Sequence, residues 1–84
     1  MHRLEVSHAA HRQISSLPVS IRDRINEVIA LLAENPRPFG NKKLTAREGY
    51  RIKVGDFRIL YLIDDTRKII TVYRVLPRGS AYRF

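Results

Sequence analysis

Three cationic side chains occupy alternate positions around a short turn in the middle of the chain. Residues 49–61 read Gly-Tyr-Arg-Ile-Lys-Val-Gly-Asp-Phe-Arg-Ile-Leu-Tyr, so that apolar and cationic residues alternate on both sides of Gly55-Asp56. Alternation with a period of two around a two-residue turn that contains Gly predicts a β-hairpin. With this turn, Lys53 lies opposite Arg58, and Arg51 shares their face. The sequence therefore predicts a cluster of three cations on one face of a hairpin.

The other face of this hairpin is apolar, and it consists of Tyr50, Ile52, Val54, Phe57, Ile59 and Tyr61. We expect its two tyrosines, Tyr50 and Tyr61, and also Tyr73, to be core residues and not catalytic ones. Like charges directly opposite one another destabilise a sheet by up to about 1 kcal/mol, so the position of Lys53 across from Arg58 needs a reason. Two interpretations fit. The cations protect a solvated edge against aggregation, or they form an anion site in which a bound phosphate relieves the repulsion.

Charge and composition favour a polyanionic partner. The chain has 84 residues with 16 Lys and Arg against 8 Asp and Glu, a net charge of +8. Such an excess indicates nucleic acid, a ribonucleoprotein or an acidic protein as the partner. The length fits a single domain over residues 1–84. The absence of Cys excludes a disulfide scaffold and a thiolate metal site and suits a reducing cytoplasm.

No apolar run approaches the roughly 20 residues of a membrane span. We therefore expect a soluble cytoplasmic protein that uses no metal, no cofactor and no membrane.

The first half of the chain predicts a strand and two helices. Residues 3–7 alternate as a short strand, with Leu4 and Val6 facing inward, and Ser7 can cap the helix that follows. Pro18 closes this helix, and Ser20 is a candidate cap for a second helix that ends near residue 34. Apolar residues recur along this second helix at helical spacing, at Ile21, Ile25, Val28, Ile29 and Leu32.

The second half predicts an antiparallel meander. Residues 39–48 read as a basic loop, and two strands of the hairpin are followed by a turn at 64–68 and a third strand from Ile69. Pairing Ile63 with Ile69 places Arg58 opposite Arg74, so that Arg74 joins the cations. The same face then continues as an apolar patch of Leu60, Leu62, Ile70 and Val72. This patch either binds a partner protein or is covered by other parts of the chain.

The predicted class is α+β: an N-terminal strand, a two-helix hairpin and a three-stranded antiparallel meander with the helices on one face.

With Leu44-Thr45, the run from Glu48 to Tyr61, and Arg78, Tyr82 and Arg83 in view, the chain resembles the RelE/ParE toxin superfamily over essentially its whole length. The run Tyr-Arg-Ile-Lys-Val-Gly-Asp-Phe-Arg-Ile-Leu-Tyr is most similar to the RelE-like branch. The resemblance implies a toxin of a type II toxin–antitoxin pair with a protein antitoxin as its partner. RelE-like members cleave mRNA in the ribosomal A site without a metal, whereas ParE members poison DNA gyrase.

The resemblance also implies site residues. By position, Arg51, Lys53, Arg58, Arg78 and Tyr82 match the family's catalytic residues, and the basic side chains expected to contact RNA are Lys42, Lys43, Arg74 and Arg83. The chain departs from the family pattern at Pro77, where many relatives carry a histidine. Its own histidines, His2, His8 and His11, all lie near the N-terminus and read as solvated or structural side chains.

Four of the five matched residues have an expected chemical role in RNA cleavage. Arg58 can bind phosphate oxygens with two parallel hydrogen bonds. Lys53 is the best candidate for the base, because two neighbouring guanidinium groups disfavour its charged form. Arg78 can stabilise the leaving group or the phosphate, and Tyr82 either stacks on a nucleobase or packs on the sheet edge.

Three hypotheses for function remain open at this stage. They are a ribosome-dependent endoribonuclease, a ParE-like gyrase poison without enzymatic activity, and an inactive basic RNA-binding module.

Overall fold

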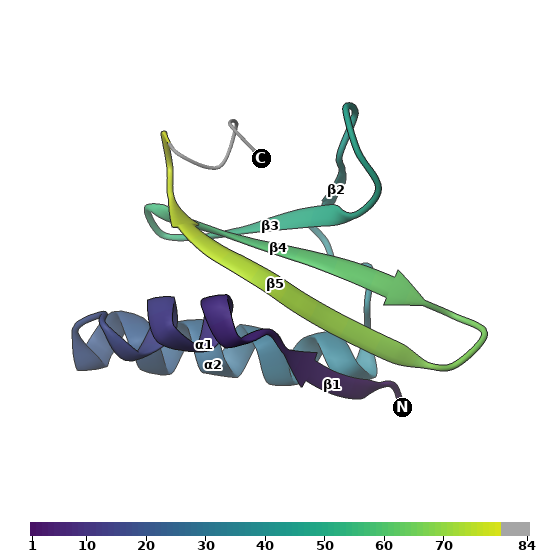
Figure 1. Cartoon of the computed structure of the whole chain (residues 1–84), viewed down its shortest axis with the longest axis horizontal. Coiled ribbons are helices and arrows are strands. Elements are labelled where there is room, and N and C mark those ends of the chain that lie inside the picture. The colour runs from purple at the N-terminus through teal and green to yellow at the C-terminus, as the bar shows by residue number, and fades with distance from the viewer. Residues whose placement is uncertain (80–84) are drawn as a thin grey trace.

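The structure is a computed structural model, and it describes residues 1–79 of the chain. Its elements in chain order are β1 (Arg3–Val6), α1 (His8–Ser15), α2 (Val19–Glu34), β2 (Lys42–Lys43), β3 (Tyr50–Val54), β4 (Phe57–Asp64) and β5 (Ile69–Pro77). The strands form one sheet in the order β1-β5-β4-β3-β2, with β1 parallel to β5 and the other neighbours antiparallel (Figure 1). The predicted α+β class is confirmed. The strand β2 is an addition, because it lies in the segment that was predicted to be a loop.

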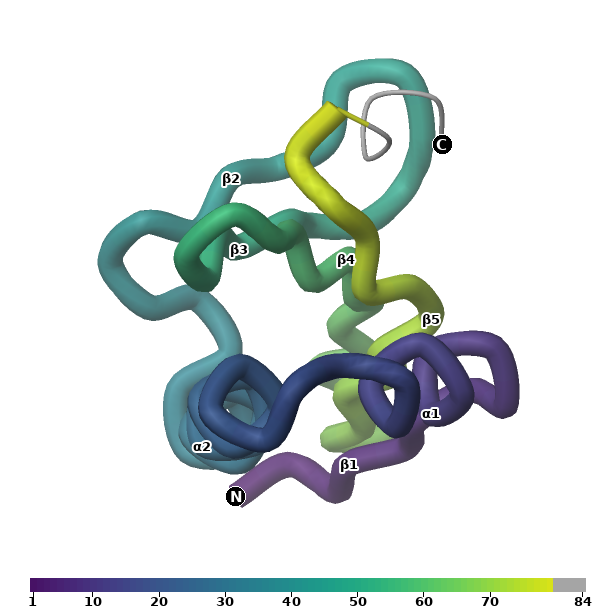
Figure 2. Tube along the Cα trace, turned by 90° about the vertical axis from the view of Figure 1, so that its left-hand side faces the viewer, coloured from purple at the N-terminus to yellow at the C-terminus, as the bar shows by residue number. Residues whose placement is uncertain are grey.

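The two helices lie on one face of the sheet, and their apolar sides build the core (Figure 2). The predicted stripe of α2 is confirmed, since Ile25, Ile29 and Leu32 are buried against strand residues such as Ile59 and Ile70. In a domain of this size, burying each such side chain contributes about 1.5–3 kcal/mol. The apolar stripe therefore fixes which face of the sheet remains outside.

The start of α1 follows the sequence, whereas the start of α2 does not. Ser7 caps α1, because its Oγ accepts a hydrogen bond from the Ala10 amide at 3.1 Å. The predicted cap of α2 at Ser20 is wrong: α2 begins at Val19, and Pro18 occupies the capping position without a side-chain hydrogen bond. Pro fits there because its fixed φ suits the entry to a helix and it has no amide to satisfy.

The central hairpin has the predicted register. Lys53 pairs with Arg58 and Ile52 with Ile59 across the turn at Gly55-Asp56. Gly55 has a φ of +59°, which is the conformation that a type II′ turn requires at its first central residue. The turn therefore sets the register of the whole β3–β4 pair.

The predicted register between β4 and β5 is wrong. Ile63 pairs with Ile70, and an irregularity follows, so that Tyr61 pairs with Val72 but Leu60 pairs with Arg74. This leaves Tyr73 as an extra residue on β5, which is a β-bulge. A shift by one residue moves side chains to the opposite face of a sheet.

One expectation fails with that register, and for Leu60 the alternative that other parts of the chain cover the patch is confirmed. Ile70 and Val72 belong to the core under the helices and not to an outer apolar patch. On the outer face, Leu60 and Leu76 are buried together against Leu44 and Tyr73.

The N-terminal strand differs from expectation in one side chain. Leu4 packs partly against the core as predicted, but Val6 is 41% exposed. Within residues 1–79, no helix combines the length and the apolar character needed to cross a membrane.

Candidate active site

Cationic side chains line a hollow on the face of the sheet that the helices leave free. The hollow has a volume of about 270 Å³ and is lined by Gly40, Lys42, Arg51, Lys53 and Arg58. We call these five residues the cationic pocket. Four of the five carry a positive charge, which favours the binding of an anion over that of a cation.

Strand pairing positions these cations. Lys42 of β2 lies opposite Arg51 of β3, and Lys53 of β3 lies opposite Arg58 of β4. Side chains of paired residues point to the same face of a sheet. The expectation that Arg51, Lys53 and Arg58 come together is therefore confirmed, and the short strand β2 adds Lys42 to them.

Arg58 is the buried member of the pocket. Only 5% of the residue is exposed, and its buried Nε has no hydrogen-bond partner. Its Nη1 donates to the Phe57 carbonyl oxygen over 3.4 Å, which is long for a hydrogen bond. Among the described carboxylates, none forms an ion pair with Arg58. A buried guanidinium with an unsatisfied donor lowers the stability of the folded state. A bound anion could supply the acceptor that Arg58 Nε lacks.

A tight turn brings Gly40 to the pocket. The Asn41 amide donates to the Pro38 carbonyl oxygen at 3.0 Å, and Gly40 has a φ of +95°. These features define a type II turn, which needs a positive φ at its third residue. Sequence reasoning missed Gly40 as part of the site, although Pro-Phe-Gly-Asn carries the signature of this turn.

The turn is held by a buried tyrosine of β4. The Tyr61 hydroxyl donates to the Pro36 carbonyl oxygen at 2.8 Å and accepts from the Asn41 side-chain amide at 3.4 Å. Burial raises the pKa of Tyr61, because the ionised phenolate would lose its solvation. Tyr61, whose ring lies in the core, therefore holds residues 36 and 41 in place on either side of the turn that approaches the pocket.

Arg37 ties the same segment to the β4–β5 turn. Its guanidinium donates to Asp65 Oδ2 at 2.9 Å and lies 5.3 Å from the centre of the Tyr50 ring. The hydrogen bond to Asp65 raises the pKa of Arg37 and lowers the pKa of Asp65. Both groups therefore stay charged over the physiological pH range, and they form an exposed ion pair.

Other predicted site residues lie outside the cationic pocket. Arg74 lines a different hollow, with Ala9, Arg12, Gln13 and Ser16 of the α1 region, so the expectation that it joins Arg58 is wrong. The cause is the bulge at Tyr73, which changes the direction of the side chains beyond it. Lys43 pairs with Tyr50 and therefore points to the opposite face from Lys42.

The end of β5 lies beside the hairpin turn. The Arg78 amide donates to the Asp56 carbonyl oxygen at 2.8 Å, although Arg78 does not line the pocket. Tyr82 and Arg83 lie outside the described residues.

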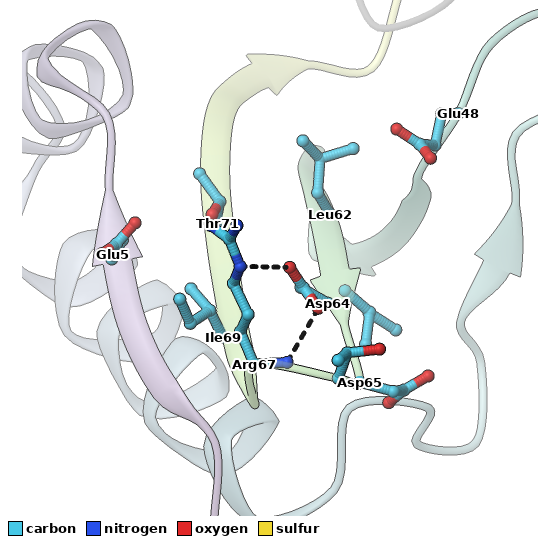
Figure 3. A pocket seen from close by; sticks show the side chains of 10 residues that line it. Glu5, Glu48, Leu62, Asp64, Asp65, Arg67, Ile69 and Thr71 are labelled. Carbon is cyan, nitrogen blue, oxygen red and sulfur yellow. Dashed lines mark hydrogen bonds and ion pairs between the residues drawn. The ribbon is translucent and has the colours of Figure 1, made fainter.

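A larger hollow, of about 520 Å³, lies at the far end of β4 and has the opposite charge (Figure 3). Its lining includes Glu5, Glu48, Asp64 and Asp65, and Arg67 bonds back to Asp64. Carboxylates repel phosphate, so this hollow is a poor site for a polyanion. Within the described residues, no group of three or more His, Cys, Asp or Glu side chains is arranged to hold a metal ion.

The chain is thus a small α+β protein that presents convergent cations on the open face of its sheet. A family model described as ParE toxin of type II toxin–antitoxin system, parDE, matches residues 4–82. A protein of Methanocaldococcus jannaschii that is named as a toxin, RelE1, is 30% identical, and the match covers 95% of this chain and 93% of that protein. The chain belongs to the RelE/ParE family of toxins of type II toxin–antitoxin systems.

Solved structures agree with this assignment. The archaeal RelE–RelB complex from Pyrococcus horikoshii contains a chain that superposes with a TM-score of 0.84 at 27% identity, covering 93% of this chain and 96% of that chain. For the RelBE2 complex of Mycobacterium tuberculosis the TM-score is 0.80 at 26% identity, with 92% and 98% covered. The RelBE complex of E. coli, at 22% identity, 92% and 96% coverage and a TM-score of 0.79, shares the fold.

Proposed function

We propose that this toxin is a ribosome-dependent endoribonuclease that cleaves mRNA and thereby inhibits translation. The observation that carries the proposal is Arg58, a buried cation with an unsatisfied Nε that faces a pocket of further cations. A surface that only binds a protein does not need a buried, unpaired guanidinium. A phosphodiester would supply the missing acceptor and relieve the repulsion between Lys53 and Arg58.

In the proposed reaction, the 2′-hydroxyl of a nucleotide attacks the adjacent phosphorus. A bond forms between O2′ and phosphorus, the bond to O5′ breaks, and the products are a 2′,3′-cyclic phosphate and a 5′-hydroxyl. The 2′-hydroxyl proton goes to a base, for which Lys53 is the candidate, and the leaving O5′ takes up a proton. Protein cations, not a metal ion, stabilise the charge that develops on the phosphate oxygens.

The remaining predicted residues have supporting roles in this proposal. Arg51 and Lys42 add positive charge around the phosphate, Arg78 stabilises the leaving group, and Tyr82 contacts the substrate. Lys43, Arg74 and Arg83 bind the RNA backbone without sequence preference. A pocket without a strong base depends on precise positioning of its substrate, and the ribosome supplies that positioning.

The proposed partners are a cognate antitoxin, the ribosome and mRNA. Relatives with this fold are seen as RelE–RelB complexes, which supports an antitoxin partner. We propose that the antitoxin binds through an acidic segment, because the toxin carries a net charge of +8.

Primer extension on translated mRNA tests the nuclease. The wild type should produce cuts inside ribosome-occupied codons, and Arg58→Ala should lower cleavage by at least about 100-fold, as the loss of one preorganised charge does in other active sites. Arg67→Ala is the matched control, because it removes the same charge at the acidic end of the molecule.

Intact mRNA in cells that the wild type still stops from growing would refute the nuclease. Gyrase supercoiling would then be measured, because poisoning of gyrase without enzymatic activity is the alternative that the ParE family model favours.

A further inference from the structure

Phe39 is an aromatic side chain that the fold leaves in water. It is fully exposed (105%), and it lies between α2 and β2. Phe is among the residue types most often buried. One exposed apolar side chain needs no explanation by itself, so the inference depends on where Phe39 is held.

The backbone at Phe39 is fixed. Phe39 is the second residue of the type II turn that the hydrogen bond from the Asn41 amide to the Pro38 carbonyl oxygen closes. Pro36 and Pro38 restrict the approach to the turn, and the Tyr61 hydroxyl holds the Pro36 carbonyl oxygen from the core. The exposed ring is therefore carried by a backbone that is already ordered.

This turn borders the cationic pocket. Gly40 follows Phe39 directly and lines the pocket beside Lys42 and Arg58. Adjacent Cα atoms are about 3.8 Å apart, and a Cβ built on Gly40 would meet nothing within 4 Å. The space beside Gly40, where the turn meets the pocket, is therefore not filled by other atoms of the described chain.

We propose that Phe39 is a stacking platform for a nucleobase of the RNA whose phosphate occupies the cationic pocket. This inference rests on the proposed function, and it adds a contact to the base where the cations contact the backbone. A base and its own phosphate are separated by about one sugar, so one nucleotide can reach both. Stacking on a single aromatic ring accepts every base, so Phe39 contributes to binding without selecting a sequence.

Four variants in the primer-extension assay test the inference. Stacking on one ring changes affinity by roughly 5-fold to 150-fold, so Phe39→Ala should reduce cleavage within this range. Phe39→Trp, which keeps an aromatic face, should cleave like the wild type, and Phe39→Leu should fail like Ala. The control is Leu31→Ala, which removes another exposed apolar side chain, from α2. Because Phe39 is fully exposed, all variants should melt at the wild-type temperature.

A binding assay gives a second readout that does not depend on cleavage. The chain contains no Trp, so Phe39→Trp creates a single Trp fluorophore. Titration with a 2′-O-methyl RNA trinucleotide, which cannot be cleaved, should quench its emission. The same titration of the double variant Phe39→Trp/Arg58→Ala should need at least about tenfold more RNA, because the phosphate loses a charged partner.

The outcomes separate this inference from the nuclease proposal. Wild-type cleavage that persists in Phe39→Ala overturns the inference and leaves the nuclease standing. Cleavage by Phe39→Leu at the wild-type level also overturns it, because the role of Phe39 would then be an apolar contact with a protein. If the wild type cuts no mRNA, the nuclease proposal fails, and the fluorescence titration alone then tests the stacking platform. Quenching that needs Arg58 supports the stacking platform, and unchanged emission overturns it.

Discussion

At the scale of single residues, Arg58 carries two properties that oppose one another. Its position on a central strand buries it to 5% exposure, while its charge demands partners that the described residues do not supply. Burial of an uncompensated charge lowers stability, but it also strengthens every interaction with an incoming phosphate. The site is therefore preorganised at the expense of the folded state.

Arg58→Met should stabilise the protein while it removes activity. Met keeps the unbranched apolar stem and removes the charge, so the free energy of unfolding should rise by about 1–3 kcal/mol. Urea denaturation followed by circular dichroism measures this change. Lys53→Met is the control, because Lys53 is exposed and surface substitutions change stability by less than about 0.5 kcal/mol.

Inorganic phosphate provides a second check on Arg58. Phosphate that binds the native pocket raises the melting temperature of the wild type, and Arg58→Met should lose this response. A loss of stability in Arg58→Met would mean that Arg58 is satisfied in the free protein and that its burial carries no strain.

At the scale of the elements, α1 completes the hydrogen bonds of the bulged strand. The bulge at Tyr73 interrupts the ladder between β4 and β5, and Gln13 Oε1 accepts the Val75 amide at 2.9 Å. Gln13→Ala should cost about 1–3 kcal/mol of unfolding free energy, because it leaves a buried amide without an acceptor. Gln13→Glu retains an acceptor and should recover most of this loss. Hydrogen exchange at the Val75 amide measures the effect locally, and unchanged protection in Gln13→Ala would contradict it.

The Tyr61 hydroxyl links the core to the segment before β2. Tyr61→Phe should cost about 0.5–1.5 kcal/mol at neutral pH, because the Pro36 carbonyl oxygen loses its donor. Tyr73→Phe is the control, since the buried Tyr73 hydroxyl has no hydrogen-bond partner.

The same substitution should change the alkaline stability. The folded pKa of Tyr61 lies above its unfolded value of 10.0. The neutral hydroxyl therefore contributes stability that is complete below that value and is lost as the pH rises through the folded pKa. Thermal melts between about pH 8 and pH 11 should show a shallower alkaline decline for Tyr61→Phe, and parallel curves for the two proteins would refute the assignment.

The elements also show which features a sequence can predict. The β3–β4 register is predictable because a two-residue turn with Gly55 leaves one way to pair. The β4–β5 register is not, because the longer turn at Asp65 to Lys68 accepts several pairings. Apolar residues at Ile70, Val72 and Val75 follow no single alternation until the extra residue Tyr73 is known. The part of the pocket that the hairpin forms was predictable from the sequence. The approach of Gly40 to the pocket was not, because it depends on how the preceding turn packs against the sheet.

At the scale of the whole molecule, charge is divided between two ends of the sheet. The cationic pocket lies near the β3–β4 turn, whereas Asp64 and Asp65 lie at the far end of β4. The resulting field orients an approaching polyanion toward the pocket. For a single-stranded 2′-O-methyl RNA, log Kd should rise with log salt, and each phosphate contact should contribute about 0.7 to the slope. Lys53→Gln should lower that slope by about this amount, whereas Arg67→Ala should leave it unchanged. An equal fall in both variants would show that only net charge matters.

The position of β5 has a consequence for how the protein is made. The last strand lies inside the sheet, between the first strand and β4, so contacts of large sequence separation close the fold. A nascent chain that has not yet presented Ile69 to Pro77 lacks the strand on which both β1 and β4 depend. The cations of the hairpin cannot act as a site before that point, because Arg58 acquires its buried setting only in the finished sheet. Under the proposed function, a ribosome that is synthesising the chain meets no complete site before β5 has emerged and paired with β1 and β4.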